Sequence, residues 1–292
     1  MMKHKSFVAF ILTHGRPDRI YTLRSLKKHG YTGRVVILID NEDKTREEYE
    51  ARYPGMVHVF DKAGISDTFD EGDNFGDRRA IVYARNACFV VAKELGVEHF
   101  IELDDDYTEF RYKTNAHDQY CNKFNLSNLD GLFDAMIDFL EATKASSVAL
   151  AQNGDFIGGH AGTNAGKLEP WRKCMNTFVC ATARPFKFFG RINEDVNVYT
   201  CGTRRGMLLF TLPNCAINQK QTQSNGGGMT DLYLDSGTYV KSFYSVMYAP
   251  SCVKVQDMGP VYRRMHHRVS WRHCAPKILA ESVRKPRKRR KT

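Results

Sequence analysis

The fold class is decided by residues 7–39, FVAFILTHGRPDRIYTLRSLKKHGYTGRVVILI. The apolar runs at its two ends, Phe7–Leu12 and Val35–Ile39, have the length and composition of buried strands. The segment between them, Asp18–His29, has the pattern of a helix. A strand, a helix and a second strand in this order form a parallel pair with a right-handed crossover. The sequence therefore predicts an α/β fold.

The same alternation continues to residue 103. Further helices are predicted at residues 44–53 and 77–95, and further strands at 57–60 and 99–103. Doubly wound parallel sheets bind ligands at the carboxyl ends of their strands. Polar residues follow three of the predicted strands at that edge: Thr13, His14, Gly15 and Arg16; Asp40 and Asn41; and Asp104, Asp105 and Asp106. We expect these residues to form one site.

The second half of the chain has a less regular pattern. Helices are predicted at residues 126–142, 194–204 and 232–248, and strands at 147–151, 176–182 and 208–212. Two glycine-rich stretches, residues 153–167 and 224–230, are expected to be long loops. Long loops in compact domains are often functional, so both are candidate lids or acceptor loops.

The composition is that of a globular protein. The 292 residues are 42% hydrophobic and 26% charged, which excludes a disordered or fibrous chain. The apolar runs are too short to cross a bilayer, and the N-terminal run is too short for a signal peptide, so we expect a cytoplasmic protein. The eight cysteines form no Cys-x-x-Cys pair, which favours reduced thiols over structural zinc or a disulfide scaffold.

The positive charge is concentrated at the C-terminus. The net charge is +10, and residues 284–292 contain seven Lys or Arg and no acid, which leaves +3 for the rest of the chain. Such a tail can follow a polyanion through counterion release, or it can simply keep the protein in solution. Both interpretations stay open from the tail alone.

The acidic cluster Asp104-Asp105-Asp106 is the main chemical signal. Mg²⁺ and Mn²⁺ prefer hard oxygen ligands and bind through one or two carboxylates together with substrate phosphates. Because side chains alternate along an extended chain, Asp104 and Asp106 can face one ion, while Asp105 faces elsewhere, towards a ribose. The alternative is a solvated acidic turn. The buried strand before the cluster favours the metal site, where a cation would neutralise a diphosphate leaving group.

These motifs together resemble the GT-A nucleotide-sugar transferases. The resemblance rests on Thr-x-Gly-Arg-Pro after the first strand, Asp40, Ala84-Arg85-Asn86 and Glu102-Leu103-Asp104-Asp105-Asp106. Over residues 6–274 the chain more narrowly resembles the TET-associated glycosyltransferases of bacteriophages. The narrower likeness rests on the aspartate cluster, Arg191-Ile-Asn-Glu194-Asp195-Val, Gly226-Gly-Gly-Met-Thr-Asp231 and His266-His267-Arg268.

The resemblance implies a donor, an acceptor and a cofactor. That family glycosylates 5-hydroxymethylcytosine in phage DNA, after a TET-like dioxygenase has made the hydroxyl. It implies a UDP-sugar donor, Mn²⁺ or Mg²⁺, DNA as partner, and the cytoplasm of an infected bacterium as location. It also implies one GT-A domain at residues 1–275, with a nucleotide-sugar-binding half at 1–110 and an acceptor half at 111–275, followed by a basic, disordered tail at 276–292.

The resemblance also implies a role for each candidate residue. The nucleotide sugar is expected to contact Thr13, Gly15, Arg16, Asp40, Arg85, Asn86 and Asp105. The metal ligands are expected to be Asp104, Asp106 and one C-terminal histidine, His266 in preference to His267. Asp195, and next Glu194, would be the general base of an inverting reaction; in a retaining reaction they would orient sugar hydroxyls. DNA contacts are expected from Arg263, Arg264, Arg268, Arg287, Lys288, Arg289 and Arg290.

Each role has a structural alternative. Gly15 can make a strand-to-helix turn, Asp40 can cap the next segment, Arg85 can be a surface charge, and the acids at 194–195 can serve as ordinary helix N-terminal charges. Three functional alternatives also stay open. A glycosyltransferase can act on a glycan, lipid or protein instead of DNA. A nucleotidyltransferase would carry a glycine-rich, lysine-bearing loop, which residues 13–16 lack. A non-enzymatic DNA-binding module leaves the acidic cluster unexplained.

Overall fold

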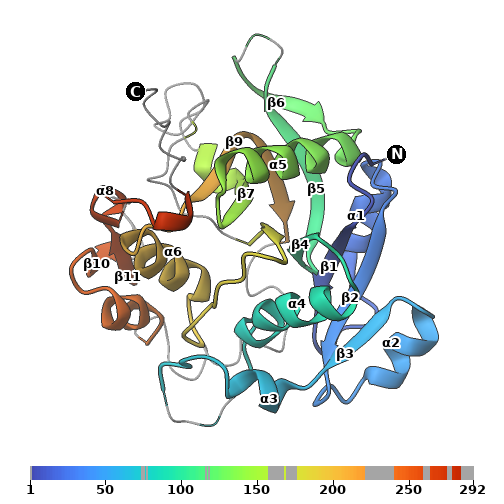
Figure 1. Ribbon diagram of the computed structural model, residues 1–292, viewed down its shortest axis with the longest axis horizontal. Coiled ribbons are helices and arrows are strands. Elements are labelled where there is room, and N and C mark those ends of the chain that lie inside the picture. Colours follow the sequence, from blue (N-terminus) through green and yellow to red (C-terminus); the bar gives the residue numbers. More distant parts are fainter. Residues whose placement is uncertain are drawn as a thin grey trace, which may run out of the picture.

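The computed structural model describes residues 2–73, 76, 78–115, 117, 119–156, 168, 176–220, 240–258, 264–274 and 278–283. The predicted α/β class is confirmed, because helices pack on both faces of one large sheet (Figure 1). In spatial order the nine strands are β3 (Val57–Phe60), β2 (Arg34–Asp40), β1 (Phe7–Leu12), β4 (His99–Asp104), β8 (Phe178–Ala181), β7 (Ser147–Gln152), β9 (Leu209–Gln219), β5 (Tyr107–Thr114) and β6 (Tyr120–Asn125).

The sheet is parallel in its first half and mixed in its second. Strands β3, β2, β1 and β4 are all parallel neighbours, as the alternating pattern predicts. Strand β8 then pairs antiparallel with β4 and with β7, whereas β7 and β9 are parallel. Strands β5 and β6 add an antiparallel hairpin at the far edge. The parallel half brings the carboxyl ends of β1, β2 and β4 to one edge, where the polar clusters were expected.

Two apolar cores lie on opposite faces of the sheet because side chains alternate along each strand. On one face, Val8, Phe10 and Leu12 of β1 belong to a core that includes α4 (Val82–Glu94) and α6 (Glu194–Arg204). On the other face, Phe7, Ala9 and Ile11 belong to a core with α1 (Tyr21–Lys28) and α5 (Leu129–Thr143). The sheet edge that carries the polar clusters is therefore held from both sides.

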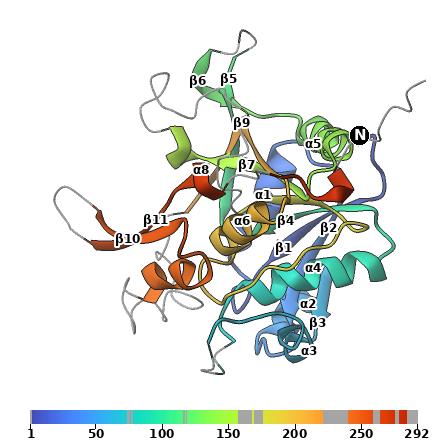
Figure 2. The same ribbon diagram turned by 60° about the vertical axis from the view of Figure 1, so that its left-hand side comes forward.

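The remaining elements are short. They are α2 (Arg46–Arg52), α3 (Lys62–Ser66), α8 (Trp271–Cys274), the 3-10 turns at Asn153–Phe156 and Glu281–Val283, and a helix that the structure describes at residues 240–248. Strands β10 (Val253–Met258) and β11 (Arg264–Val269) form a separate antiparallel ribbon. Figure 2 shows this ribbon at the side of the molecule, away from the nine-stranded sheet. Within the described residues, no helix combines the length and the apolar character that crossing a membrane requires.

Several predicted boundaries differ from the observed ones. The helix expected from residue 18 begins at Tyr21, because residues 16–19 form a turn in which the Arg19 backbone N–H donates to the Arg16 carbonyl at 3.0 Å. The helix expected from residue 77 begins at Val82. The hairpin β5–β6 and helix α3 were not predicted, and β9 extends seven residues beyond the predicted end at 212. The helix predicted at residues 194–204 is confirmed as α6. Residues 157–167 and 224–230 of the two predicted loops, and tail residues 284–292, lie outside the described part of the chain.

Candidate active site

The carboxyl ends of β1 and β4 meet directly, since Leu12 is the register partner of Asp104. The next residue on each side continues the contact: the Thr13 hydroxyl donates to Asp105 Oδ2 at 2.6 Å. Arg16 Nη1 lies 3.5 Å from Asp105 Oδ1. The predicted nucleotide-binding residues Thr13, Arg16 and Asp105 therefore form one cluster at the strand ends, with Thr13 and Asp105 buried and Arg16 partly exposed. In it, the Asp105 carboxylate is oriented by the loop that follows β1.

Asp106 carries a buried carboxylate oxygen, Oδ1, that accepts no hydrogen bond from the described residues. Burial, and then the charges of Asp104 and Asp105, raise the pKa of Asp106 to about 7. The pKa of Asp104 is also raised, chiefly by burial, against the opposing effect of Arg85. Ionised oxygens at this place need a cation beside them.

Arg85 supplies part of that positive charge. Its guanidinium is 2% exposed and lies 2.9 Å from Glu194 Oε1, 3.1 Å from Asp104 Oδ1 and 3.4 Å from Glu102 Oε2. The plane also packs near the rings of Phe178 and Phe188, at 5.1 and 5.8 Å from their centres. The alternative that Arg85 is a surface helix charge is therefore wrong. Arg85 connects two acids of β4, Glu102 and Asp104, with Glu194 at the start of α6.

Asn86, the neighbour of Arg85, contacts the backbone of Phe188, and its expected contact with the nucleotide sugar stays a prediction. Its side-chain amide donates to the Phe188 carbonyl at 2.9 Å, and its oxygen accepts from the Phe188 backbone N–H at 3.0 Å. Asn86 is 1% exposed. Its described contacts hold the segment that leads from β8 to α6, next to Arg85.

Glu194 and Asp195 stand at the start of α6 and face the same acids. Asn193, just before them, has a left-handed φ of 56°, which turns the chain into the helix. Burial and the Asp195 charge raise the pKa of Glu194 to about 7, although Arg85 opposes them. Asp195 Oδ1 accepts from the Val196 backbone N–H at 2.8 Å, and the Asp195 charge contributes to raising the pKa of Asp104. The structure thus brings both predicted catalytic acids to the aspartate cluster.

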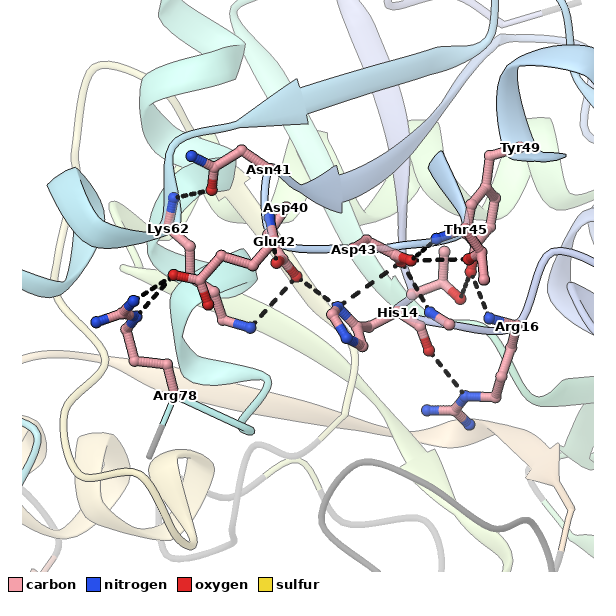
Figure 3. A network of polar contacts seen from close by, with 12 residues as sticks. His14, Arg16, Asp40, Asn41, Glu42, Asp43, Thr45, Tyr49, Lys62 and Arg78 are labelled. Carbon is pink, nitrogen blue, oxygen red and sulfur yellow. Dashed lines mark hydrogen bonds and ion pairs between the residues drawn. The ribbon is translucent and has the colours of Figure 1, made fainter. Parts of the chain in front are cut away.

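A second network surrounds Asp40 at the end of β2 (Figure 3). His14 Nδ1 donates to Asp40 Oδ2 at 2.7 Å, and Lys62 Nζ lies 3.4 Å from the same oxygen. Burial raises the pKa of Asp40, but these two partners and the Glu42 backbone N–H outweigh it and hold the pKa below its ordinary value. The sequence interpretation did not identify Lys62, which starts α3 and carries no local signal of a buried role.

The loop after β1 is tied to the helix after β2. The Gly15 backbone N–H donates to Asp43 Oδ2 at 2.7 Å, and the Arg16 backbone N–H donates to the Tyr49 hydroxyl at 2.8 Å. Gly15 has φ +67°, a conformation that favours glycine, so the predicted turn is observed. Asp43 and Tyr49 were not identified from the sequence, because their partners lie 28 and 33 residues away.

The C-terminal histidines lie on the β10–β11 ribbon. His266 Nδ1 donates to the His267 carbonyl at 2.7 Å, and the two rings are 4.4 Å apart. His267 Nδ1 lies 3.5 Å from Asn193 Nδ2, so His267 is the one adjacent to the start of α6. Among the described residues, no three His, Cys, Asp or Glu side chains are arranged to hold a metal ion.

The predicted DNA contacts are only partly described. Arg268 lies on β11 and donates from Nη1 to Gln256 Oε1 at 2.8 Å, in an exposed position. Arg264 begins β11, but its side chain lies outside the described part of the structure. Arg263, Arg287, Lys288, Arg289 and Arg290 also lie outside the described residues.

An open cavity of about 660 Å³ lies beside the segment that leads into α6. The loop at residues 66–73 and the helix at 240–248 line it with Ser66, Phe69, Asp70, Glu71, Gly72, Asp73, Met247 and Tyr248. Backbone hydrogen bonds from Gly190 to Asp70 and from Arg191 to Glu71 attach this loop to the chain just before α6. Carboxylates beside aromatic rings suit hydroxyl-rich ligands better than phosphates.

The sequence matches one family model, TET-Associated Glycosyltransferase, over residues 7–228. No curated protein matches it significantly. Among solved structures, it aligns with glucosyl-3-phosphoglycerate synthase from Mycobacterium tuberculosis in complex with Mg²⁺ and UDP, at 10% identity and a TM-score of 0.39, covering 91% of this chain and 88% of that one. It also aligns with a mycobacterial protein at 9% identity and a TM-score of 0.44, covering 90% and 83%. Because the family match spans most of the chain, we conclude that this protein is a glycosyltransferase of the TET-associated glycosyltransferase family.

Proposed function

We propose that the protein transfers a sugar from a UDP-sugar to the hydroxyl of 5-hydroxymethylcytosine in DNA, with a divalent cation held by Asp104 and Asp106. The observation that carries the proposal is the group of acids at the carboxyl ends of the strands, where Asp106 Oδ1 is buried without a hydrogen-bond partner among the described residues. The family's association with TET proteins supports a hydroxymethylated base as the acceptor.

The residues present fit a hard divalent cation. Mg²⁺ and Mn²⁺ bind through one or two carboxylates and complete their shell with phosphates and water. Asp104 lies close enough to Asp106 for its charge to contribute, after burial, to raising the pKa of Asp106, and two such carboxylates suit an ion that arrives with a nucleoside diphosphate. When bound, the cation neutralises the charge that develops on the departing diphosphate.

The protein's own residues position this chemistry. Arg85 holds Asp104 and Glu194 in fixed relative positions. One oxygen of Glu194 thereby accepts a hydrogen bond from the Arg85 guanidinium. Asp195 has no such cationic partner among the described residues; its Oδ1 accepts from the neighbouring backbone N–H. Asp195 is therefore the better general base, taking the proton from the acceptor hydroxyl as it attacks the sugar. If the reaction retains configuration, the two acids instead orient sugar hydroxyls.

The phosphate backbone of the DNA would be held away from the acids, while the acceptor base reaches them. A two-stranded ribbon such as β10–β11, with the exposed Arg268, is a suitable element for phosphate contacts. The basic residues at 284–292 add charge that favours any DNA sequence equally. Specificity for the modified base is then assigned to the active site.

A transfer assay tests the proposal. The protein is incubated with Mn²⁺, a panel of radiolabelled UDP-sugars, and DNA with or without 5-hydroxymethylcytosine. We expect label only on the modified DNA, and loss of label in Asp106→Ala. Asp138→Ala is the matched control, because Asp138 is an exposed acid on α5 whose ion-pair partners among the described residues are Lys3 and His4.

The outcomes separate the alternatives. Label on neither DNA, together with release of sugar from the UDP-sugar, would assign the enzyme to a glycan, lipid or protein acceptor. Equal labelling of unmodified DNA would remove the hydroxymethyl group from the proposal. A folded Asp106→Ala enzyme with full activity would remove the metal role.

A further inference from the structure

The carboxylates at the end of β2 are already occupied by the protein. Asp40 Oδ2 faces His14 and Lys62, and Asp40 Oδ1 accepts from the Glu42 backbone N–H at 3.1 Å. Asp43 Oδ2 accepts from the Gly15 N–H, and Asp43 Oδ1 accepts from the backbone and hydroxyl of Thr45. Asp40 is 5% exposed. A nucleotide at this edge can therefore be reached through the exposed hydrogen-bond partner of Asp40.

That partner is His14. The His14 side chain is 47% exposed, whereas the Asp40 side chain is 6% exposed. The two side chains point toward one another (Figure 3). A carboxylate only accepts, so Nδ1 must carry the proton in the 2.7 Å contact with Asp40. In a neutral imidazole the other nitrogen, Nε2, is then an acceptor. Among the described residues, Nε2 of His14 has no hydrogen-bond partner.

We propose that His14 Nε2 accepts the N3–H of the uracil base of the donor nucleotide, so that His14 selects the base and Asp40 is the positioning residue behind it. This rests on the proposed use of a nucleoside diphosphate sugar. Uracil offers an N–H donor at N3, whereas cytosine has an acceptor at the same place. An unpaired acceptor facing another acceptor costs binding free energy, which disfavours cytosine.

Lys62 is the second side-chain partner of Asp40, after His14. Lys62 is 5% exposed, and its ammonium lies 3.4 Å from Asp40 Oδ2, which favours the ionised carboxylate. An ionised Asp40 can only accept, so it fixes the His14 tautomer. The predicted contact of Asp40 with the nucleotide thus becomes an indirect one, through His14.

The test compares two variants that differ only in reach. His14→Asn keeps a group near the Nδ1 position, which can still bond to Asp40, but has nothing at the Nε2 position. His14→Gln places an amide oxygen at about the distance of Nε2. Dissociation constants for UDP, CDP and 2′-deoxy-UDP are measured with Mn²⁺ by titration calorimetry at pH 8, and thermal unfolding confirms that each variant is folded. His58→Asn is the matched control, because His58 of β3 also pairs with an acid, Glu94 at the end of α4.

We expect the wild type and His58→Asn to bind UDP about tenfold more tightly than CDP. His14→Asn should bring that ratio close to one, and His14→Gln should restore most of it. A His14→Asn variant that keeps the wild-type ratio overturns the inference, as does a wild type without base preference. A variant that instead equalises UDP and 2′-deoxy-UDP assigns His14 to the ribose and also overturns it. A wild type that binds neither UDP nor CDP contradicts the proposed function itself.

Discussion

At the scale of single residues, Arg85 connects most of the site's charge. Its side chain contacts one acid in the middle of β4, one at the end of β4 and one at the start of α6. The sequence located Arg85 and the acids, because they follow recognisable strand and helix patterns. It did not reveal that Arg85 faces the acids, since Glu194 is 109 residues away. The sequence could therefore predict which residues belong to the site, but not which of them contact one another.

Replacing Arg85 tests this role. In Arg85→Lys, one compact ammonium cannot span three carboxylates that surround a planar guanidinium. We expect kcat to fall about 100-fold as the acids lose their positions. In Arg85→Ala, the free energy of unfolding should fall by about 3 kcal/mol, because the buried acids lose their cation. Urea unfolding and initial rates measure both effects.

Arg184→Lys is the matched control, because Arg184 pairs with Glu141 outside the site. It should keep nearly full activity. An Arg85→Lys enzyme with the wild-type kcat would show that the contacts of Arg85 have no catalytic consequence.

The two acids of α6 are separated by a similar experiment. Asp195→Asn should lower kcat by about 10²–10⁴, because it removes a general base, and should leave the affinity for UDP unchanged. Glu194→Gln should have a smaller effect, because a glutamine oxygen can still accept from Arg85. A larger loss of kcat in Glu194→Gln than in Asp195→Asn would assign the general base to Glu194 instead.

At the scale of elements, the parallel strands could be predicted and the antiparallel ones could not. Strands β1 and β2 contain continuous apolar runs because they are buried on both faces, and β4 adds Phe100, Ile101 and Leu103 to the same pattern. Strand β5 (YTEFRYKT) alternates polar and apolar residues unevenly, and its partner β9 lies about a hundred residues later. Such a strand is stabilised by its partners rather than by its own composition.

An ion-pair cluster attaches α5 to the sheet and predicts a response to acid. Glu141 contacts Arg184 at 3.0 Å and His99 at 2.9 Å. Burial raises the pKa of Glu141, but Arg184 and His99 outweigh it and lower the pKa to about 2. A lowered folded-state pKa contributes stability above the ordinary glutamate range, and that stability is lost as pH falls towards 2.

We therefore expect Glu141→Gln to flatten the loss of wild-type stability between about pH 4.5 and pH 2. Thermal unfolding across that range measures it, with Glu50→Gln on α2 as an exposed control. Parallel curves for the wild type and Glu141→Gln would contradict the assignment.

The β10–β11 ribbon predicts a salt-dependent effect. If Arg268 neutralises one phosphate, Arg268→Ala should weaken binding to all DNA sequences alike and reduce the slope of log affinity against log salt by about 1. Fluorescence anisotropy at several salt concentrations measures this, with Lys27→Ala on α1 as control. An unchanged slope would place the DNA elsewhere.

At the scale of the whole molecule, one edge of the sheet collects residues from distant parts of the chain. The parallel topology accounts for the meeting of residues 13–16, 40–41 and 104–106, and the sequence predicted that meeting. It did not predict that β8 would pair antiparallel with β4, which follows from packing between the two halves. That pairing leads the chain, through the segment after β8, to α6 and so to the two acids.

The central claim is that the aspartates bind a cation together with the nucleotide diphosphate. It is tested most directly by titrating UDP into the protein with and without Mn²⁺, for the wild type and for Asp106→Asn. The account predicts that Mn²⁺ tightens UDP binding at least about tenfold in the wild type and has no effect in the variant. Equal UDP affinity with and without Mn²⁺ in the wild type, or the same enhancement in Asp106→Asn, would contradict it.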